Sequence, residues 1–385
     1  MNLRLSINNS LHQPCVAQII GTFGGGGAQR LAYNLAQGLA GQGIRSLAIA
    51  LREKGSYAEN TGTEVKLFAL GTDVGKLSSI FNTYFALRRL IREERIEVLH
   101  VHGAPSLPFV VVATRFLPQK PKLVFTWHDS GSVLEKISLR ERLMIWSLSR
   151  CDLVTGSSRL VTKKLADRAS LSCVNVFHGG VPLSPPSSQI DSPCPMILWV
   201  GRIVPPKDPQ ILVRAASLLK SEGLKFSVCM LGKPIPSTVW YMDETRALIE
   251  QLGLGDVIST PGFALDDELQ KIMEQADISV QTSHTEGLSL ALLEQMMAGL
   301  AIIATDVGDT TVAIQDGING IVIPPKDEAR LVTALRQLLT DPSLRRKYAS
   351  AARERAVNCF SVRAMATNAK NDYVKLLAEN KLAPR

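Results

Sequence analysis

The segment ADISVQTSHTEGLSLALLEQMMAGLAIIATDVGD, residues 276–309, contains the pattern that repeats through the chain. Two short runs of mostly apolar residues, 277–281 and 301–305, are expected to be strands. The apolar stretch between them, 288–298, has the length of a buried helix. Because a strand, a helix and a second strand in succession form a unit with parallel strands, the segment predicts a parallel sheet covered by helices.

The same alternation continues along the whole chain. In the first half, strands are expected at 16–21, 45–51, 64–70, 97–102, 122–127, 152–155 and 173–177, and helices at 28–41, 76–95, 137–149 and 158–169. In the second half, further strands are expected at 196–200, 225–231, 256–260 and 320–323, and further helices at 207–222, 238–253, 266–275, 327–340 and from Pro342 onward. The pattern predicts an α/β protein with two doubly wound sheets.

A stretch rich in proline and serine, GGVPLSPPSSQIDSPCP at 179–195, separates the two halves and has the composition of a linker. We expect a first domain at 1–182, a linker at 183–195 and a second domain at 196–358. The last helix, 359–385, is expected to return toward the first domain. Two such domains facing each other would leave a cleft at the carboxyl ends of both sheets, where doubly wound folds bind ligands.

The composition is that of an ordinary globular protein. The 385 residues are enough for two domains with full cores, and 45% hydrophobic with 20% charged residues is a usual balance. No apolar run reaches the roughly 20 residues that span a bilayer, and MNLRLSINNSLHQPC (1–15) lacks a hydrophobic secretory segment, so we expect a cytoplasmic protein. None of the six cysteines lies in a C-x-x-C pair, so buried thiols are expected rather than a zinc site.

The net charge is +8, and the basic residues are densest in three stretches of the first half, 87–95, 136–150 and 159–168. These stretches are either solvated helix faces or a surface attracted to anionic lipid, with Met144, Ile145 and Trp146 entering the interface. In the second case the protein would contact the inner face of the plasma membrane. Because the sequence contains no recognisable nucleic-acid-binding module, nucleic acid is not an expected partner.

A glycine-rich loop, Gly24 to Gly27, lies between the first strand and the first helix. Glycine lets the backbone come close to another group, and a helix N-terminus offers N–H donors to an anion. In a G-x-G-x-x-G frame that starts at Gly24 the last position is Gln29, and the loop has no Walker lysine, so it is neither a clean dinucleotide fingerprint nor a P-loop. Both a tight turn and a phosphate-binding loop stay open.

Histidines end two of the expected strands, in LHVHG (99–103) and FTWHDSG (125–131). His100 and His102 would point to the same side of a strand, but no third ligand lies nearby, so a metal pair is not expected. His128 is the better functional candidate, because polar, flexible residues follow it at a strand end, where functional side chains project. The alternative is that each histidine forms structural hydrogen bonds.

Two cations follow the strand at 196–200, in VGRIVPPK (200–207). Arg202 and Lys207 lie on a short loop that two prolines make rigid, just before an expected helix. Such a pair suits a diphosphate, since each charge-assisted hydrogen bond to it contributes about 1.5–3 kcal/mol. The alternative is a surface turn in which Asp208 is an ordinary helix N-cap.

Two glutamates, Glu286 and Glu294, flank the start of the apolar helix expected at 288–298. On a continuous helix their axial separation would be roughly 12 Å. That exceeds the ~5–9.5 Å between the carboxylates of a glycosidase. The spacing matches an elongated ligand that touches both residues, with its phosphates at the helix N-terminus; alternatively, Glu294 pairs with a buried arginine.

In combination, these motifs closely resemble the retaining GT-B glycosyltransferases of family 4. The matching segments are GRIVPPK (201–207), LGKP (231–234), PGF (261–263), residues 276–309, and DGINGIVIPPKD (316–327). The glycine loop, VLHVHG, TWHD and HGGVP also follow the family's order, so the resemblance spans nearly the whole chain. It implies two Rossmann-like domains facing across a cleft, and transfer of a sugar from a nucleotide-diphosphate sugar to a hydroxyl with retention of anomeric configuration.

The resemblance also implies roles for individual residues. The catalytic residues would be His128, Arg202, Lys207 and Glu286, with the two cations neutralising the departing diphosphate, while Glu294 would hold the ribose. The donor would be contacted by Gly25 and Gly26 of the glycine loop, Gly262 and Phe263 of the base pocket, and Arg202, Lys207, Glu286, Gly287, Leu288, Ser289, Leu290 and Glu294.

The resemblance further defines the expected partners. The donor would be a UDP- or GDP-sugar. The acceptor is expected to dock on the first domain, whose basic, partly amphipathic helices favour a glycan or a lipid-linked precursor of a cell-surface polysaccharide. No metal and no cofactor is expected, because enzymes of this kind generally need no divalent ion and the sequence has no Asp-x-Asp placed to hold one.

The chain departs from the family pattern at three places. Val312 stands where a Gly-Gly-x-Pro-Glu sequence has its glutamate, Ala301 replaces a common proline, and Gln281-Thr282 replaces Leu-Pro. These departures affect fine details of the sugar pocket and not the contacts to the diphosphate. Three other functions stay open: a nucleotide-sugar 2-epimerase, a nicotinamide oxidoreductase, and a catalytically silent subunit of a glycan-assembly complex, which the altered GDTTV segment (308–312) keeps possible. The imperfect glycine fingerprint and ALREKG (50–55), where an acidic residue should end the second strand, argue against the oxidoreductase.

Overall fold

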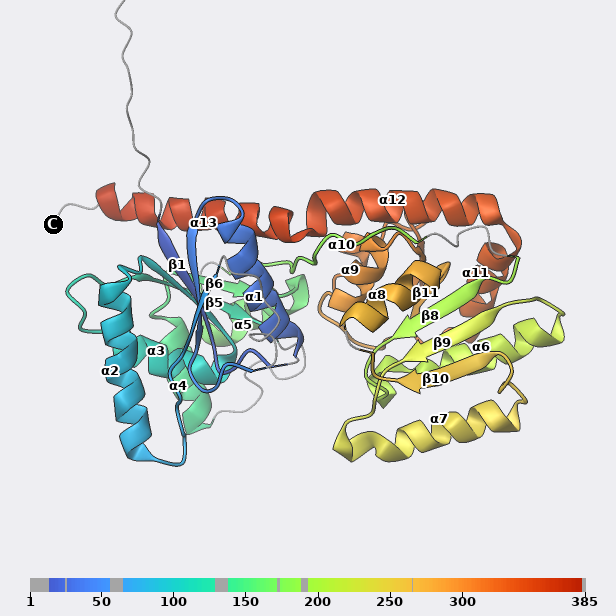
Figure 1. Cartoon of the computed structure of the whole chain (residues 1–385), viewed down its shortest axis with the longest axis horizontal. Helices are drawn as coiled ribbons and strands as arrows, with labels where there is room; N and C mark the ends of the chain where they lie inside the picture. Colours follow the sequence, from blue (N-terminus) through green and yellow to red (C-terminus); the bar gives the residue numbers. More distant parts are fainter. Residues whose placement is uncertain are drawn as a thin grey trace, which may run out of the picture. The chain divides into compact units, whose positions relative to one another are not determined.

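The computed structural model describes residues 14–24, 26–55, 65–128, 138–171, 174–187, 193–264 and 266–382. Within them, the strands form two parallel sheets covered by helices (Figure 1). One sheet is built from the first half of the chain and the other from the second half. This is the α/β, doubly wound fold class that the alternating sequence pattern predicts.

The first sheet has seven strands, β1 (Cys15–Ile20), β2 (Arg45–Ala50), β3 (Lys66–Ala69), β4 (Val98–His102), β5 (Lys122–Trp127), β6 (Leu153–Gly156) and β7 (Asn175–Val176). They lie in the order β3-β2-β1-β4-β5-β6-β7, which reverses between β1 and β4. The helices of this half are α1 (Gly27–Ala40), α2 (Leu77–Glu93), α3 (Leu107–Thr114), α4 (Leu139–Leu148) and α5 (Arg159–Ala169), and a 3₁₀ turn at Ala104–Ser106 precedes α3.

The second sheet has six strands, β8 (Met196–Val200), β9 (Ser227–Leu231), β10 (Ile258–Gly262), β11 (Ile278–Gln281), β12 (Ala301–Thr305) and β13 (Ile321–Ile323). Their order, β10-β9-β8-β11-β12-β13, reverses between β8 and β11. The helices are α6 (Pro209–Ser221), α7 (Val239–Gln251), α8 (Asp266–Gln275), α9 (Leu290–Met297), α10 (Thr310–Ala313), α11 (Glu328–Thr340), α12 (Pro342–Phe360) and α13 (Val362–Leu382), with 3₁₀ turns at Pro205–Lys207 and Pro236–Thr238.

The second sheet is buried on both faces. In β8, Ile197 and Trp199 pack with α6, α7 and α11, whereas Leu198 between them packs with α9 and α12. Successive side chains of a strand point to opposite faces, so a sheet covered on both sides needs continuous apolar strands. Burial of one Leu or Ile side chain contributes about 1.5–3 kcal/mol, so the two cores fix the strands whose carboxyl ends position the site.

Every expected strand and helix is present to within a few residues, but two helices were not expected. One is the four-residue α10. The other is α3, whose sequence LPFVVVAT has a proline in its first turn, where proline is common, but then three successive valines, which helix interiors disfavour. Because α3 packs between α2 and α4, tertiary contacts outweigh its weak intrinsic preference.

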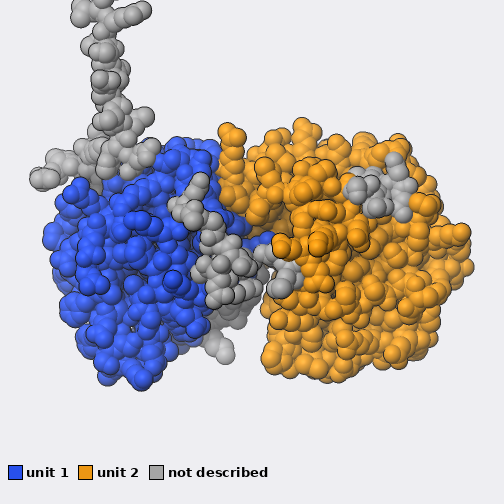
Figure 2. Space-filling model, viewed as in Figure 1, with its two compact units in different colours: residues 1–126, 138–154, 366–385 blue, residues 127–137, 155–365 orange. Residues whose placement is uncertain are grey.

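The chain divides into two compact units (Figure 2). Unit 1 comprises residues 1–126, 138–154 and 366–385, and unit 2 comprises 127–137 and 155–365. The domain limits expected from the sequence stay a prediction. Within unit 1, the hydroxyl of Tyr373 in α13 hydrogen-bonds to Nδ1 of His100 in β4 at 2.7 Å, which joins the last helix to the first sheet.

The cysteines depart in part from the expected burial. Cys15 and Cys229 are buried, but Cys194 and Cys359 are exposed, and Cys173 lies outside the described residues. In the part of the chain that the structure describes, no helix has the length and apolar character needed to cross a membrane.

Candidate functional site

The candidate site lies where the strand order of the second sheet reverses. The loop after β8 contains Arg202 and Lys207, and the loop after the neighbouring strand β11 contains Glu286. Connections from adjacent strands leave in opposite directions at such a reversal, which opens a crevice at the carboxyl edge of the sheet. The fold therefore brings residues some 80 positions apart, such as Lys207 and Glu286 (|i−j| = 79), to one place.

Glu286 is the centre of this site. Its Oε1 atom accepts hydrogen bonds from the ammonium group of Lys207, from Oγ of Ser283 at 2.8 Å and from Nε2 of Gln281 at 3.3 Å. The side chains of Lys207 and Glu286 are mostly buried, so their ion pair is screened less than a surface pair. Among the described residues Oε2 has no hydrogen-bond partner, so this oxygen remains available to a ligand.

Further hydrogen bonds join the two loops. The hydroxyl of Thr282 donates to the carbonyl of Lys207 at 2.8 Å, and the backbone N–H of His284 donates to the carbonyl of Pro206 at 2.8 Å. Nε2 of His284 lies 2.8 Å from Oδ2 of Asp208. Asp208 adopts φ +41° and caps α6 by accepting from the N–H of Ile211, so the helix-cap interpretation of this aspartate is confirmed and holds together with a position in the site.

Arg202 does not join the pair formed by Lys207 and Glu286. Its side chain is exposed, and it forms no ion pair or hydrogen bond with any residue in the described ranges. Both cations lie on the loop between β8 and α6, and their shared contact with a diphosphate stays a prediction. Lys207 is fixed by Glu286, whereas Arg202 extends from the start of the same loop.

The geometry expected for Glu286 and Glu294 is wrong in one respect. Helix α9 begins at Leu290, two residues later than expected, because the hydroxyl of Ser289 accepts from the N–H of Leu292 and caps the helix there. Glu286 lies in the preceding loop, so the separation calculated for a continuous helix does not apply. Glu294 lies in α9 and is half-buried rather than fully enclosed by its apolar neighbours.

The loop after β12 holds the Glu286 loop in place. The backbone N–H of Asp309 donates to the carbonyl of Gly287 at 2.7 Å. Gly308 has φ +57°, and a Cβ atom there would lie 2.3 Å from the carbonyl oxygens of Glu286 and Gly287, so only glycine fits. The Asp309 side chain is 1% exposed and accepts from the backbone N–H and Nε of Arg159 and from Nε2 of His178. This carboxylate occupies the second glycine position of the Gly-Gly-x-Pro-Glu pattern.

The loops after β9 and β10 lie further along the same edge of the sheet. Nζ of Lys233 is 4.7 Å from the centre of the Phe263 ring, which is exposed. Gly262 has φ +95°, and its carbonyl accepts from the N–H of Gly232 at 2.8 Å. Phe263 follows β10, and β9 separates that strand from β8, so its place in a base pocket stays a prediction.

The glycine loop and His128 belong to the first half of the chain. Burial lowers the pKa of His128 to about 4, so its imidazole is neutral at pH 7. Gly25 lies outside the described residues. Gly26 caps α1, and its N–H donates to Oε1 of Gln29 at 2.6 Å. The Gln29 side chain therefore occupies an amide that a bound phosphate would need.

His100 and His102 form structural hydrogen bonds. Nε2 of His100 lies 2.6 Å from the hydroxyl of Thr126, and Nε2 of His102 lies 2.8 Å from Oε1 of Gln18. Across the described parts of the chain, no group of three or more His, Cys, Asp and Glu side chains is placed to hold a metal ion.

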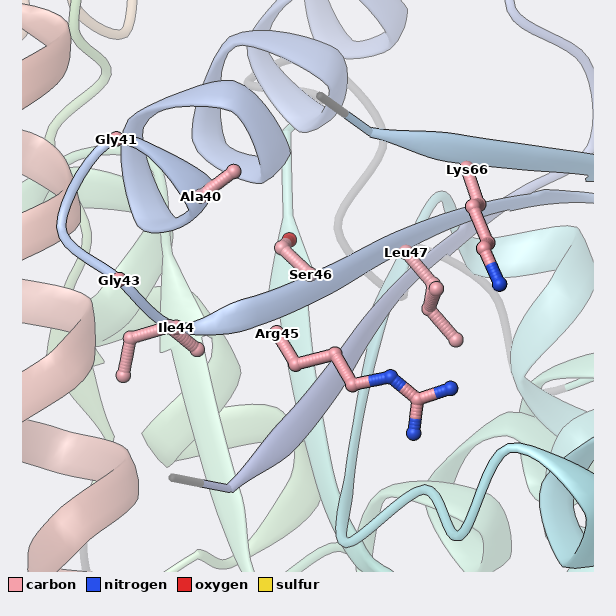
Figure 3. A pocket seen from close by; sticks show the side chains of 8 residues that line it. All are labelled: Ala40, Gly41, Gly43, Ile44, Arg45, Ser46, Leu47 and Lys66. Atoms are coloured by element: carbon pink, nitrogen blue, oxygen red, sulfur yellow. The ribbon is translucent and has the colours of Figure 1, made fainter. Parts of the chain in front are cut away.

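A pocket of about 520 Å³ lies elsewhere, beside the end of α1 and the beginning of β2 (Figure 3). Ile44, Arg45, Ser46 and Lys66 contribute to its lining, and Arg45 is paired with Glu94. It lies at the amino ends of β2 and β3, opposite the edge where doubly wound sheets bind ligands.

Sequence reasoning found Lys207 and Glu286 but did not predict the role of four residues that hold their loops, which are Asp208, Gln281, Ser283 and Asp309. Asp208 had a local signal, since an Asp before Pro209 is a typical helix start. Gln281 was visible only as a departure from the family pattern, and Ser283 and Asp309 were not singled out by any sequence signal. Their partners are distant in the sequence or depend on loop geometry.

Two parallel sheets of this kind, with a charged site at the order reversal of the second, are typical of GT-B glycosyltransferases. The model of the family described as "Glycosyl transferases group 1" matches residues 182–355, and the model described as "Glycosyltransferase Family 4" matches residues 25–184. The two models together cover most of the chain, which belongs to the GT-B glycosyltransferases of family 4.

Curated relatives include two enzymes named D-inositol 3-phosphate glycosyltransferase. The one from Frankia alni is 30% identical over 231 residues, which cover 54% of this chain and 57% of that protein. The one from Acidothermus cellulolyticus is 34% identical over 154 residues, 39% of this chain and 34% of that protein. The matched part thus spans less than two thirds of either relative.

Solved structures show the same fold at low sequence identity. HepE from Anabaena, in complex with UDP and glucose, is 18% identical with a TM-score of 0.75, and the match covers 93% of this chain and 98% of HepE. Sucrose-phosphate synthase from Thermosynechococcus elongatus is 19% identical with a TM-score of 0.76, covering 95% and 100% of the two chains.

Proposed function

We propose that this chain is a retaining glycosyltransferase that moves a sugar from a nucleotide-diphosphate sugar to a hydroxyl group without a divalent metal. The observation that carries the proposal is the pairing of Lys207 with Glu286 at the order reversal of the second sheet. A cation beside a carboxylate with one available oxygen suits a ligand that is anionic at one end and rich in hydroxyls at the other. Family membership and the UDP complex of HepE support this assignment.

In the proposed reaction, the bond between the anomeric carbon and the diphosphate oxygen breaks. The acceptor hydroxyl oxygen bonds to the same face of that carbon, and its proton passes to the departing phosphate. Negative charge therefore grows on the diphosphate, and a cation already fixed in a partly buried site stabilises it without reorganising. Lys207 would supply this charge, and Arg202 would swing from its exposed position to add a forked contact.

The hydrogen bonds of Glu286 give it a separate role. Ser283 and Gln281 hold Oε1, so the carboxylate keeps its position when the diphosphate attracts Lys207 away. Oε2 would then accept a hydrogen bond from a hydroxyl of the transferred sugar. We carry over from the family a neutral His128 facing that sugar and Glu294 at the ribose.

The remaining donor contacts are proposed in the same way. Gly26, with Gly25, would cover the phosphates, which requires the Gln29 side chain to leave the Gly26 amide. Gly262 and Phe263 would line the base pocket. The acceptor would be a glycan or a lipid-linked precursor of a cell-surface polysaccharide, with the protein acting in the cytoplasm at the inner face of the plasma membrane.

Calorimetric titration with UDP-, GDP- and ADP-sugars in the presence of EDTA tests this function. One donor should bind to the wild type, and Lys207→Ala should weaken that binding. Lys220→Ala is the matched control, because Lys220 is a lysine of the same unit that pairs with Asp256 away from the site. If the folded protein binds none of these donors, the proposal is refuted.

The anomeric configuration of the product, read by NMR during turnover, tests retention. An inverted product would overturn the retaining mechanism. Isomerisation of the donor sugar without an acceptor would instead identify a nucleotide-sugar 2-epimerase. Donor binding with no turnover toward any hydroxyl acceptor would favour a catalytically silent subunit.

A further inference from the structure

Helix α2 exposes large apolar side chains on the face opposite its core contacts. Leu77 is 76% exposed, and Phe81 and Phe85 are each 63% exposed. Residues four positions apart lie on one side of a helix, so these three form a continuous stripe. The residues that α2 buries, Thr83, Leu87, Leu90 and Ile91, point the other way. An ordinary solvated helix would place polar residues where this stripe lies.

The stripe is continued by arginines. Arg89 and Arg92 follow Phe85 on the same side of α2, and both are exposed. Arg89 lies 3.8 Å from Glu93, an acidic residue of the same helix that is itself exposed. The exposed face of α2 is therefore apolar in its first half and predominantly basic in its second.

The end of α3 extends this surface. Arg88 donates from its guanidinium to the carbonyl of Ala113 at 2.8 Å and to the carbonyl of Phe116 at 3.1 Å, which joins α2 to α3. Phe116 is exposed, and the Arg115 guanidinium lies 5.4 Å from its ring centre. Figure 1 shows α2 and α3 as neighbours within unit 1. We call the surface formed by Leu77, Phe81, Phe85, Arg89, Arg92, Arg115 and Phe116 the α2–α3 face.

This surface differs from the one expected from the sequence. Of the residues expected to enter a lipid interface, Met144 is buried and Ile145 and Trp146 are half-buried, because that side of α4 packs inward. The basic stretch at 87–95 was recognised, but its apolar partners Phe81 and Phe85 precede it and were not.

We propose that the α2–α3 face binds the interface of an anionic bilayer. Phenylalanine and leucine side chains enter the boundary between headgroups and acyl chains, and flanking arginines meet lipid phosphates while their aliphatic stems cover apolar surface. The positive charge of the face favours an anionic bilayer over an apolar protein surface. The face combines three arginines with exposed aromatic side chains, and the whole chain has a net charge of +8. The inference deepens the membrane location proposed above, and it involves no residue of the donor site.

Co-sedimentation of the full chain with vesicles tests the proposal. Vesicles of phosphatidylcholine with 30 mol% phosphatidylglycerol (roughly the anionic content of a charged leaflet) are compared with phosphatidylcholine alone. The wild type should pellet with the anionic vesicles, and far less with the neutral ones or in high salt. Each arginine removed, in Arg89→Gln and Arg92→Gln, should weaken binding about fivefold.

The double variant Phe81→Ser/Phe85→Ser should weaken vesicle binding by more than about tenfold. Leu218→Ser is the matched control, because Leu218 is an exposed helical leucine of unit 2 and its replacement should leave binding unchanged. Donor titration of the double variant should match the wild type. If the wild type binds anionic vesicles but none of the nucleotide sugars, that result would count against the donor site alone.

A gain-of-signal measurement covers the case in which the double variant does not fold. In Phe85→Trp, lipids with brominated acyl chains should quench tryptophan emission beyond the quenching seen for the wild type. Absence of extra quenching, or wild-type binding by the folded double variant, would overturn the proposal. So would a dimer that sediments without lipid and dissociates in the double variant, since that would identify a second copy of the chain as the partner.

Discussion

Replacement of Asp309 by asparagine tests how the Glu286 loop is held. One carboxylate oxygen of Asp309 accepts from the backbone N–H of Arg159 and from Nε2 of His178, both at 2.9 Å, and the other accepts from Nε of Arg159 at 3.1 Å. Asparagine has the same shape but a single acceptor oxygen. Whichever way the amide is placed, its –NH₂ group faces a donor nitrogen.

The size of the effect follows from these contacts. A lost hydrogen bond to a charged group costs about 1.5–3 kcal/mol, and here the Asp309 side of the contact is buried. The Arg159 side chain is 60% exposed and can regain water, which limits the loss. We therefore expect the free energy of unfolding to fall by about 2 kcal/mol, which lowers Tm by about 4–8 °C for a unit of roughly 200 residues.

Differential scanning calorimetry and donor titration of Asp309→Asn provide the measurements. The Asp309 side chain fixes the segment whose backbone N–H holds the carbonyl of Gly287, so weakening the side-chain contacts should loosen this segment and lower donor affinity several-fold along with Tm. The control is Asp256→Asn, which removes a surface carboxylate paired with Lys220 and should leave both quantities nearly unchanged. Wild-type Tm and donor affinity in Asp309→Asn would refute the inference that this buried carboxylate holds the loop.

Three further predictions follow from the site. Lys207→Ala should lower kcat about 10²–10³-fold, because it removes the fixed charge beside the leaving diphosphate; initial rates measure this, and a loss below tenfold would contradict the role. Gln281→Leu removes a hydrogen bond to Glu286 together with a buried oxygen, Gln281 Oε1, that has no partner among the described residues. Its free energy of unfolding should therefore stay within about 1 kcal/mol of the wild type while kcat/KM falls several-fold, and an unchanged kcat/KM would show that this hydrogen bond does not position Glu286. The pKa of His128 is lowered to about 4 in the folded chain, against about 6.5 when unfolded, so the unfolded state binds the extra proton between these values. Stability should fall as the pH drops from 6.5 to 4, and thermal melts of His128→Gln should show a smaller acid dependence; equal acid dependence would contradict the burial of a neutral imidazole.

The strands and most helices could be predicted from the sequence because their causes are local. A strand buried on both faces must be apolar throughout, as in AIIAT at β12, and an amphipathic helix must repeat its apolar residues every three or four positions. Two errors, the missed helix α3 and the start of α9 placed two residues too early, also have local causes. The three successive valines of α3 disfavour a helix, and the sequence does not show that the cap at Ser289 makes α9 begin two residues later than expected.

The sequence by itself determined the fold class, the positions of the strands and of most helices, and the candidates Lys207 and Glu286, because periodicity and motif spacing are properties of neighbouring residues. Only the tertiary structure decided that Lys207 pairs with Glu286 while Arg202 stands apart, and that Asp309 is buried against Arg159 and His178. It also placed Phe81 and Phe85 on the solvent side of α2. These contacts join residues that are far apart in the sequence and meet only where strand ends and helix faces come together in the fold. A local sequence pattern does not specify which of these residues meet.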